Sequence, residues 1–426
     1  MRDKRLSIGL RAALAIFTVT LFVTSAWAAD HETVLYNFGT SQYDGDGDTS
    51  LIRDAAGNLY GVTSAGGIYQ CGIFGCGTVF ELSPGIGGGW TETVLYNFGN
   101  GTDGVAPNGL IMDAAGNLYG LTESGGLYGG GIAYELSRSQ GGGWTETVLY
   151  NFSSGGGYGN GSYSLWRDTA GNLYGTMLYG GTYGEGMVFQ LSPSGDGAWT
   201  ETVLYSFGNG GDGQNPESGV IMDAAGNLYG TTVQGGIYCP SLSGCGTVYE
   251  LSPSQRGSWT ETVLHSFDGS DGLRPWASLI FDSAGNLYGT TQESGLYNYG
   301  TVFELSPTEG GGWTETVLHN FNQDGHDGWS PLAALIWDTA GNLYGTTLYG
   351  GTNLYGTVFE LSPRQGGWTE TVLYNFDNLN LGGSLFGTVV MDRAGDLYGT
   401  TEEGGLYYYG AAFELTPPAI RPASVN

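Results

Sequence analysis

The stretch GLIMDAAGNLYGLTESGGLYGGGIAYELSRSQGGGWTETVLYNF, residues 109–152, contains four short runs suited to β-strands. They are GLIMD (109–113), NLYGLT (117–122), GIAYELS (131–137) and WTETVLYNF (144–152). Val, Thr, Tyr, Phe and Trp dominate these runs, and glycine-rich turns separate them. In the Asp-x-x-Gly-Asn turn after the first run, Asp caps its own turn and Gly or Asn accepts a positive φ. The stretch therefore predicts a unit of four strands.

The same unit recurs along the chain, and three motifs count it independently. ETVLYNF, DxAGNLYG and GTVFELSP, each in close variants, occur seven times. The first motif recurs at steps of 54, 55 or 60 residues, which is near the longer blade repeats of β-propellers. Its copies begin at Glu32, Glu92, Glu146, Glu201, Glu261, Glu315 and Glu370.

The strand pattern and the two ends of the repeat array indicate the fold. Near-continuous apolar runs such as TVLYNF are typical of sheets covered on both faces, as stacked propeller blades are. A β-helix needs shorter rungs, and a β-sandwich does not need seven copies. A lone fourth strand, residues 32–38, precedes the first unit, and the last unit stops after its third strand, residues 410–416. We predict an all-β, seven-bladed β-propeller in which these two strands pair and hide the sheet edges.

Residues 1–28 have the three parts of a secretory signal peptide. Basic residues lead into an apolar stretch at 12–24, and Ala26-Trp27-Ala28 supplies a small-x-small cleavage site. An uncleaved anchor is the alternative, but an apolar stretch of 13 residues is shorter than the roughly 20 that a spanning helix needs. We expect an exported protein, periplasmic or secreted, with one propeller domain at 29–417 and a short tail at 418–426.

The composition limits the partners. The chain has 41 acidic and 12 basic residues, a net charge of −29, which repels the phosphates of nucleic acids and anionic membranes. Cations and neutral sugars are the expected partners. The 80 glycines follow no G-X-Y period, which excludes collagen, and 40% apolar residues argue against disorder.

The unit AGNLYGTT…GG…GTVFELSP…GWTETVLYNF resembles the GloVer-type tandem repeats of exported bacterial proteins, often found with one of several C-terminal surface anchors. The resemblance covers essentially the whole chain after the leader. It implies export and a repeat-built β architecture, and it implies no activity. After Thr416 only PPAIRPASVN remains, without an apolar tail or a sorting motif, so the sequence departs from the anchored pattern.

Alternating strand directions divide the loops between two faces. The near-identical DAAGN turns and SP…GGGW loops share one face, and the irregular loops share the other, which we call the variable face. Binding sites usually lie on variable loops that a rigid scaffold displays. We therefore expect any site on the variable face.

Four cysteines lie in two equivalent loops of the variable face, Cys71 with Cys76 and Cys239 with Cys245. In an oxidising compartment, two local disulfides are the expected pairing. A Cys₄ zinc site is the alternative, and it would need loops of the first and fourth blades to meet across the ring. The disulfides would stabilise the loops without carrying chemistry.

Aromatic residues recur on the variable face. A tyrosine follows the tyrosine of LYG by nine residues in six units, and Trp276 and Trp329 lie in the other set of variable loops. Such a ring would stack on sugars, whereas the alternative, favoured by the repetition itself, is that each tyrosine packs on the next blade. The tyrosines are Tyr69, Tyr128, Tyr183, Tyr238, Tyr297 and Tyr407.

Carboxylates also gather in the variable loops. Asp44, Asp46 and Asp48 alternate in DGDGD, as at the start of a calcium loop, but Ala55 stands where a bidentate Glu is expected. We predict at most a weak calcium site and no other cofactor, and the alternative is solvated turn formers. Paired loop carboxylates would also suit glycosidic cleavage, although the sequence does not show which two meet.

Nucleophilic catalysis has little support. Of four histidines only His326 lies in a variable loop, beside Asp324 and Asp327, and it has no evident Ser or Cys partner. The regularity of the repeats favours an exported, non-enzymatic scaffold that binds a glycan or a protein through the variable face. The alternatives are an extracellular hydrolase or lyase acting on polysaccharide, and a purely structural envelope protein.

Overall fold

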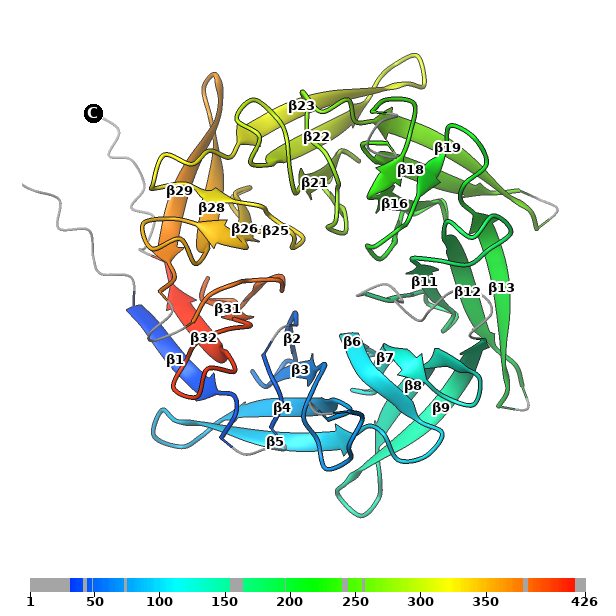
Figure 1. Cartoon of the computed structure of the whole chain (residues 1–426), viewed down its shortest axis with the longest axis vertical. Coiled ribbons are helices and arrows are strands. Elements are labelled where there is room, and N and C mark those ends of the chain that lie inside the picture. Colours follow the sequence, from blue (N-terminus) through cyan, green and yellow to red (C-terminus); the bar gives the residue numbers. More distant parts are fainter. Residues whose placement is uncertain are drawn as a thin grey trace, which may run out of the picture.

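The computed structural model describes residues 31–40, 44–47, 49–72, 75–153, 164–195, 197–239, 244–254, 257–377 and 382–417. Within them, seven four-stranded antiparallel sheets form a ring, and no helix is present (Figure 1). The prediction of an all-β, seven-bladed β-propeller is confirmed. The leader at 1–28 and the tail at 418–426 lie outside the described residues.

The strands of each blade follow one another along the chain, so neighbours in sequence are neighbours in the sheet. Blade 1 contains β2 (Ile52–Arg53), β3 (Leu59–Thr63), β4 (Thr78–Pro84) and β5 (Trp90–Asn97). Blade 2 contains β6 (Gly104–Met112), β7 (Leu118–Gly125), β8 (Gly129–Arg138) and β9 (Trp144–Ser153). Blade 3 contains β10 (Trp166–Arg167), β11 (Leu173–Met177), β12 (Met187–Pro193) and β13 (Trp199–Ser206). Blade 4 contains β15 (Ile221–Met222), β16 (Leu228–Thr232), β18 (Thr247–Pro253) and β19 (Trp259–Ser266).

The remaining blades have the same plan. Blade 5 contains β20 (Ile280–Phe281), β21 (Leu287–Thr291), β22 (Thr301–Pro307) and β23 (Trp313–Asn320). Blade 6 contains β25 (Ile336–Trp337), β26 (Leu343–Thr347), β28 (Thr357–Arg364) and β29 (Gly367–Asn375). Blade 7 contains β30 (Val390–Met391), β31 (Leu397–Thr400), β32 (Ala411–Thr416) and β1 (His31–Asn37). Short ribbons join β14 (Gly213–Gln214) to β17 (Gln234–Gly235) and β24 (Gly328–Trp329) to β27 (Tyr349–Gly350).

Strand exchange closes the ring as predicted. β1 pairs antiparallel with β32, with His31 opposite Thr416 and Asn37 opposite Ala411 (Figure 1). The Thr400 hydroxyl also donates to the Thr49 carbonyl at 2.6 Å, which joins blade 7 to blade 1. Both contacts connect the two ends of the repeat array.

The core lies between the blades. The buried apolar residues form seven clusters, and each cluster combines side chains from two adjacent blades. Each blade therefore buries one face against each neighbour, which explains the near-continuous apolar runs. Threonine hydroxyls add bonds between blades, as from Thr231 to the Ala277 carbonyl at 3.3 Å.

The first, innermost strand of each blade differs in length from the five-residue run GLIMD (109–113) that the sequence predicts for it. β6 extends over Gly104–Met112, whereas the first strands of the other six blades pair over two residues each. Residues just before these short strands line the cavity described below.

Candidate functional site at the axis and the variable face

The predicted tyrosines lie mostly in solvent. Five of them, Tyr128, Tyr183, Tyr238, Tyr297 and Tyr407, are between 42% and 58% exposed, while Tyr69 packs against the apolar cluster that contains Cys71 and Cys76. An exposed aliphatic residue precedes the tyrosine in four of these loops and in the Tyr69 loop. These residues are Ile68, Leu127, Ile237, Leu296 and Leu406. Exposed apolar side chains gathered on one face are typical of interaction surfaces.

A hydrogen bond from the strand below holds these loops. In blade 5, the Asn320 side-chain oxygen accepts from the backbone N–H of Leu296 at 2.8 Å. The same hydrogen bond occurs in four other blades, where a backbone N–H donates to the side-chain oxygen of an asparagine. The donor and acceptor pairs are Ile68 and Asn97, Leu127 and Asn151, Thr352 and Asn375, and Leu406 and Asn37. The asparagine of the YNF motif therefore orders the loop that carries the exposed pair.

The other aromatic residues predicted for this face separate into different environments. Trp329 is half-buried between Tyr299 and Tyr349, with ring centroids 5.7 and 4.6 Å away. His326 is exposed, and its backbone N–H donates to Asp324 at 2.8 Å. Trp276 lies at the axis of the ring, where it lines a cavity. The predicted set thus does not converge on one point.

The DGDGD carboxylates point to separate partners. Asp44 is buried, and its Oδ2 accepts from the Tyr36 hydroxyl at 3.0 Å and the Thr40 backbone at 2.8 Å. Asp46 accepts from the Ala65 backbone at 3.3 Å, and burial raises the pKa of its carboxyl. Asp48 lies outside the described residues. The calcium site stays a prediction.

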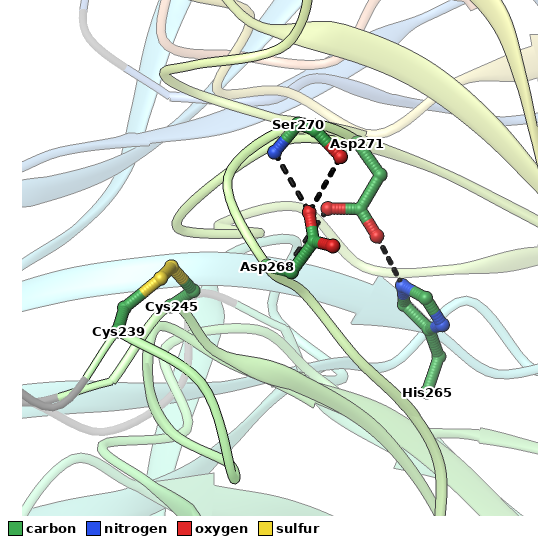
Figure 2. The surroundings of a disulfide bond; sticks show 6 residues. All are labelled: Cys239, Cys245, His265, Asp268, Ser270 and Asp271. Atoms are coloured by element: carbon green, nitrogen blue, oxygen red, sulfur yellow. Dashed lines mark hydrogen bonds and ion pairs between the residues drawn. A yellow bond between two sulfur atoms is a disulfide. The ribbon is translucent and has the colours of Figure 1, made fainter.

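Both predicted disulfides are present, Cys71–Cys76 and Cys239–Cys245. All four thiols are used, so the alternative of a Cys₄ zinc site is wrong. Figure 2 shows that the second disulfide lies near the 265–271 segment, which leads out of blade 4. The two bonds indicate a chain that folds in an oxidising compartment, as expected of an exported protein.

A cavity of about 630 Å³ occupies the axis of the propeller. Residues from all seven blades line it. Most lie just before or within the first strands, and Gln292 and Leu348 directly follow the second strands of blades 5 and 6. Most of these residues are small, such as Ala277, Ser278, Ala333 and Ala334, and their small volume keeps the axis open. Larger apolar side chains also line the cavity: Trp276, Leu332 and Phe386 come from blades 5, 6 and 7, and further ones are Ile52, Leu110, Ile111 and Leu348.

Polar side chains also line the cavity. Glu217 of blade 4 lines the cavity, and burial raises the pKa of its carboxyl to about 7. Trp276 Nε1 and Gln292 Oε1 are buried and have no hydrogen-bond partner among the described residues. The Glu217 carboxyl is therefore the ionisable group of the cavity wall, and two unpaired polar atoms lie buried within that wall in blade 5. Such buried groups cost free energy when they stay unpaired.

The family model of the Gloeobacter/Verrucomicrobia repeat matches residues 15–242 and 239–423, which together span nearly the whole chain. The chain belongs to the Gloeobacter/Verrucomicrobia repeat family. This confirms the resemblance that the repeat motifs carry. No curated protein sequence matches it.

Solved structures share the fold of this Gloeobacter/Verrucomicrobia repeat protein at low identity. The extracellular domain of a protein described as a hybrid two-component system from B. thetaiotaomicron is 14% identical, with a TM-score of 0.53. That match covers 91% of this chain but only 41% of the other. A gluconolactonase from Xanthomonas campestris is 16% identical with a TM-score of 0.41, over 75% of this chain and 88% of the enzyme. At 14% identity the first of these matches shows the fold alone.

Trp276, which the sequence predicts as a loop aromatic, is one of four axial residues of the Gloeobacter/Verrucomicrobia repeat protein that share a position in the repeat. Six residues before the Asp of each DxAGN turn, the repeats carry Glu217, Trp276, Leu332 and Phe386 in blades 4 to 7. The next two positions are small in each of these blades. The residue type at this position varies from blade to blade, although the two positions after it stay small. Such variation indicates a side chain that is not required for packing within the repeat.

Among the described residues, no helix is long and apolar enough to cross a membrane.

Proposed function

We propose that this protein is an exported, non-enzymatic binding scaffold whose axial cavity and variable face together take a glycan. One sugar ring would stack on Trp276 in the cavity, and neighbouring residues of the glycan would lie over the aliphatic–tyrosine pairs. The observation that carries the proposal is the axial cavity itself, in which the Glu217 carboxyl lines the wall together with apolar side chains that include Trp276. This mixture suits sugars, which present hydroxyls at their edges and C–H groups on their faces.

The charge of the cavity limits the glycan. Glu217 is its single ionisable side chain among the described lining residues, and the chain carries a net charge of −29. An acidic polysaccharide would be repelled, whereas a neutral or amino-substituted glycan would be accepted. The periplasm and the cell exterior both satisfy the proposal, because the disulfides require only an oxidising compartment.

A glycan array followed by titration calorimetry on the chain without its leader tests the proposal. We expect Trp276→Ala to weaken binding of the best neutral oligosaccharide about tenfold or more, a loss of roughly 1.4 kcal/mol. Glu217→Gln keeps the shape, so it should spare neutral glycans and weaken amino-substituted ones. Ile86→Ala, at a fully exposed residue on the opposite face, is the matched control and should change nothing.

Three outcomes would contradict the proposal. The first is the absence of binding to any glycan, and the second is equal affinity of the Trp276→Ala variant. The third is release of reducing ends or unsaturated products from a polysaccharide, which would identify an enzyme. Retention of binding in calcium-free buffer would show that the DGDGD loop is not needed.

A further inference from the structure

Several blade boundaries carry a repeated contact between an aromatic residue, an aspartate and a glutamate. In the outer strand, the tyrosine of VLYNF donates to an aspartate of the following loop, as Tyr96 does to Asp103 at 2.9 Å. The glutamate of the next blade's ETVLYNF motif, here Glu146, lies close enough for its charge to interact with Asp103. Tyr205, Asp212 and Glu261 repeat this arrangement. Two boundaries have histidine in place of the tyrosine, His265 and His319.

The boundary between blades 5 and 6 brings three ligand-type groups together. His319 is on β23, Asp327 is in the loop that leads into blade 6, and Glu370 is on β29. One ligand atom from each lies within 4.8 Å of the other two, and His319 Nε2 is 3.1 Å from Asp327 Oδ2. Ligands about 2.0–2.1 Å from a tetrahedral zinc ion are roughly 3.3 Å apart, so this spacing fits a metal centre.

Two oxygens of this cluster have no partner. Asp327 is 5% exposed, and its Oδ1 is buried without a hydrogen-bond partner among the described residues. Glu370 Oε1 is buried and without a partner in the same way. In contrast, Asp327 Oδ2 accepts from the backbone and the side chain of Asn322, both at 3.0 Å, besides its contact with His319. Asn322 thus orients the Asp327 carboxylate and leaves its Oδ1 free. Residues that hydrogen-bond to metal ligands commonly orient those ligands in this way.

No positive side chain neutralises the cluster. Among the described residues, no ion pair joins an arginine to Asp327 or Glu370. Two adjacent carboxylates that are largely removed from water favour a bound cation. An imidazole beside two carboxylates selects a transition metal over calcium, because calcium takes oxygen ligands.

We propose that His319, Asp327 and Glu370 bind one divalent transition-metal ion, zinc foremost, which links the outer strand of blade 5 to that of blade 6. His319 Nε2 and one oxygen from each carboxylate are the three protein ligands, and water completes the coordination. The site is separate from the axial cavity and from the disulfides. Its role is to clamp the boundary between two blades.

The neighbouring boundary supplies a control within the chain. His265 Nε2 contacts Asp271 Oδ2 at 2.7 Å, as His319 does Asp327, and Figure 2 shows both side chains. Here, however, Asp271 Oδ1 accepts from the Asp268 backbone at 3.0 Å, so both oxygens of this aspartate are used. Only Glu315 Oε1 is left without a partner among the described residues. We expect no metal of comparable affinity at this boundary.

Zinc titration of the chelator-treated chain, followed by calorimetry and elemental analysis, tests the site. We expect one tightly bound Zn²⁺ per chain and a rise in the unfolding temperature on binding. In the His319→Tyr variant, position 319 carries the tyrosine that most other blade boundaries have. This variant should therefore fold normally, but it should neither bind zinc nor show the rise in unfolding temperature. His265→Tyr should leave both unchanged. Cobalt in place of zinc should give a visible absorption band that His319→Tyr removes.

Glu370→Gln provides a second variant in case the tyrosine is not accommodated. It keeps the side chain's volume, and we expect it to lower zinc affinity about tenfold or more. The proposal is overturned if zinc fails to bind at one equivalent, or if binding survives His319→Tyr. It is also overturned if His265→Tyr or His326→Ala removes the ion, because the site would then lie elsewhere.

Discussion

Gly289 of β21 lies opposite Phe303 of β22, and a Cβ atom on it would stand 2.6 Å from the phenyl Cζ. The glycine of LYG faces an aromatic ring in the same way in other blades, as Gly61 faces Phe80. The φ of Gly289 is not positive, so space rather than backbone freedom requires glycine here. The LYG glycine of each blade is thus part of a packing contact rather than a source of flexibility.

Replacing Gly289 with alanine should therefore destabilise the protein through overpacking. We expect a loss of about 1–3 kcal/mol in the free energy of unfolding, measured by denaturant titration. Gly310→Ala is the control, because nothing lies within 4 Å of a Cβ at that position. Equal stability of the two variants would show that Phe303 can move aside without cost.

At the scale of an element, the loop between the second and third strands is ordered by the strand outside it. The asparagine of YNF reaches across the blade to a backbone N–H of that loop, as Asn320 does to Leu296. This bond lies directly before Tyr297, which is half in solvent. A rigid loop loses less conformational entropy when it binds, so this bond would favour the binding that we propose for the variable face.

Asn320→Ala should release this loop while the blade stays folded. We expect faster amide hydrogen exchange at residues 293–299, with unchanged protection in β22 and β23. Glu309→Ala, at an exposed turn of the opposite face, should leave the exchange of the loop unaltered. Unchanged exchange in Asn320→Ala would mean that packing, not this hydrogen bond, orders the loop.

At the scale of the whole molecule, acidic pairs at the blade boundaries couple stability to pH. Burial, with the charge of a nearby aspartate, raises the pKa of Glu92, Glu146 and Glu261 from 4.5 to about 7. A raised pKa means that the folded ring holds these protons more tightly than the unfolded chain does. The resulting stabilisation is full below about pH 4.5 and is lost as pH rises through about 7.

The unfolding temperature should therefore be higher at pH 5 than at pH 8. The triple variant Glu92→Gln, Glu146→Gln, Glu261→Gln cannot lose these protons, so its two temperatures should differ less than those of the wild type. Thermal unfolding followed by circular dichroism measures both. A wild-type protein that is more stable at pH 8 would refute the assignment.

Turn aspartates such as Asp54 act in the opposite direction. Burial raises the pKa of the Asp54 carboxyl, but hydrogen bonds from Asn58 outweigh burial and lower this pKa overall, so the stabilisation is lost in stronger acid.

The fold was predictable because the same packing contacts recur in every sequence repeat. LYG glycines, TVF aromatics and ETVLYNF strands recur in near-identical form, so one unit predicts the others, and residues 32–38 show how the ring closes. The axial site was not predictable in the same way. Glu217, Trp276 and Phe386 line one cavity only because the seven blades converge on the axis, and their distances across the ring depend on strand tilt and residue volume. Likewise, His319 and Glu370 looked like ordinary members of an outer-strand motif until their neighbours in space were known.

The pairing of β1 with β32 has a mechanical consequence. His31, at the start of β1, lies opposite Thr416, at the end of β32, so both flanking segments leave the pair at the same end. Tension between these segments loads the ladder hydrogen bonds one after another, as in peeling, instead of all together, as in shear. The ring thus has one seam of low mechanical resistance, while the boundaries between the other blades bear no direct load until that seam has opened.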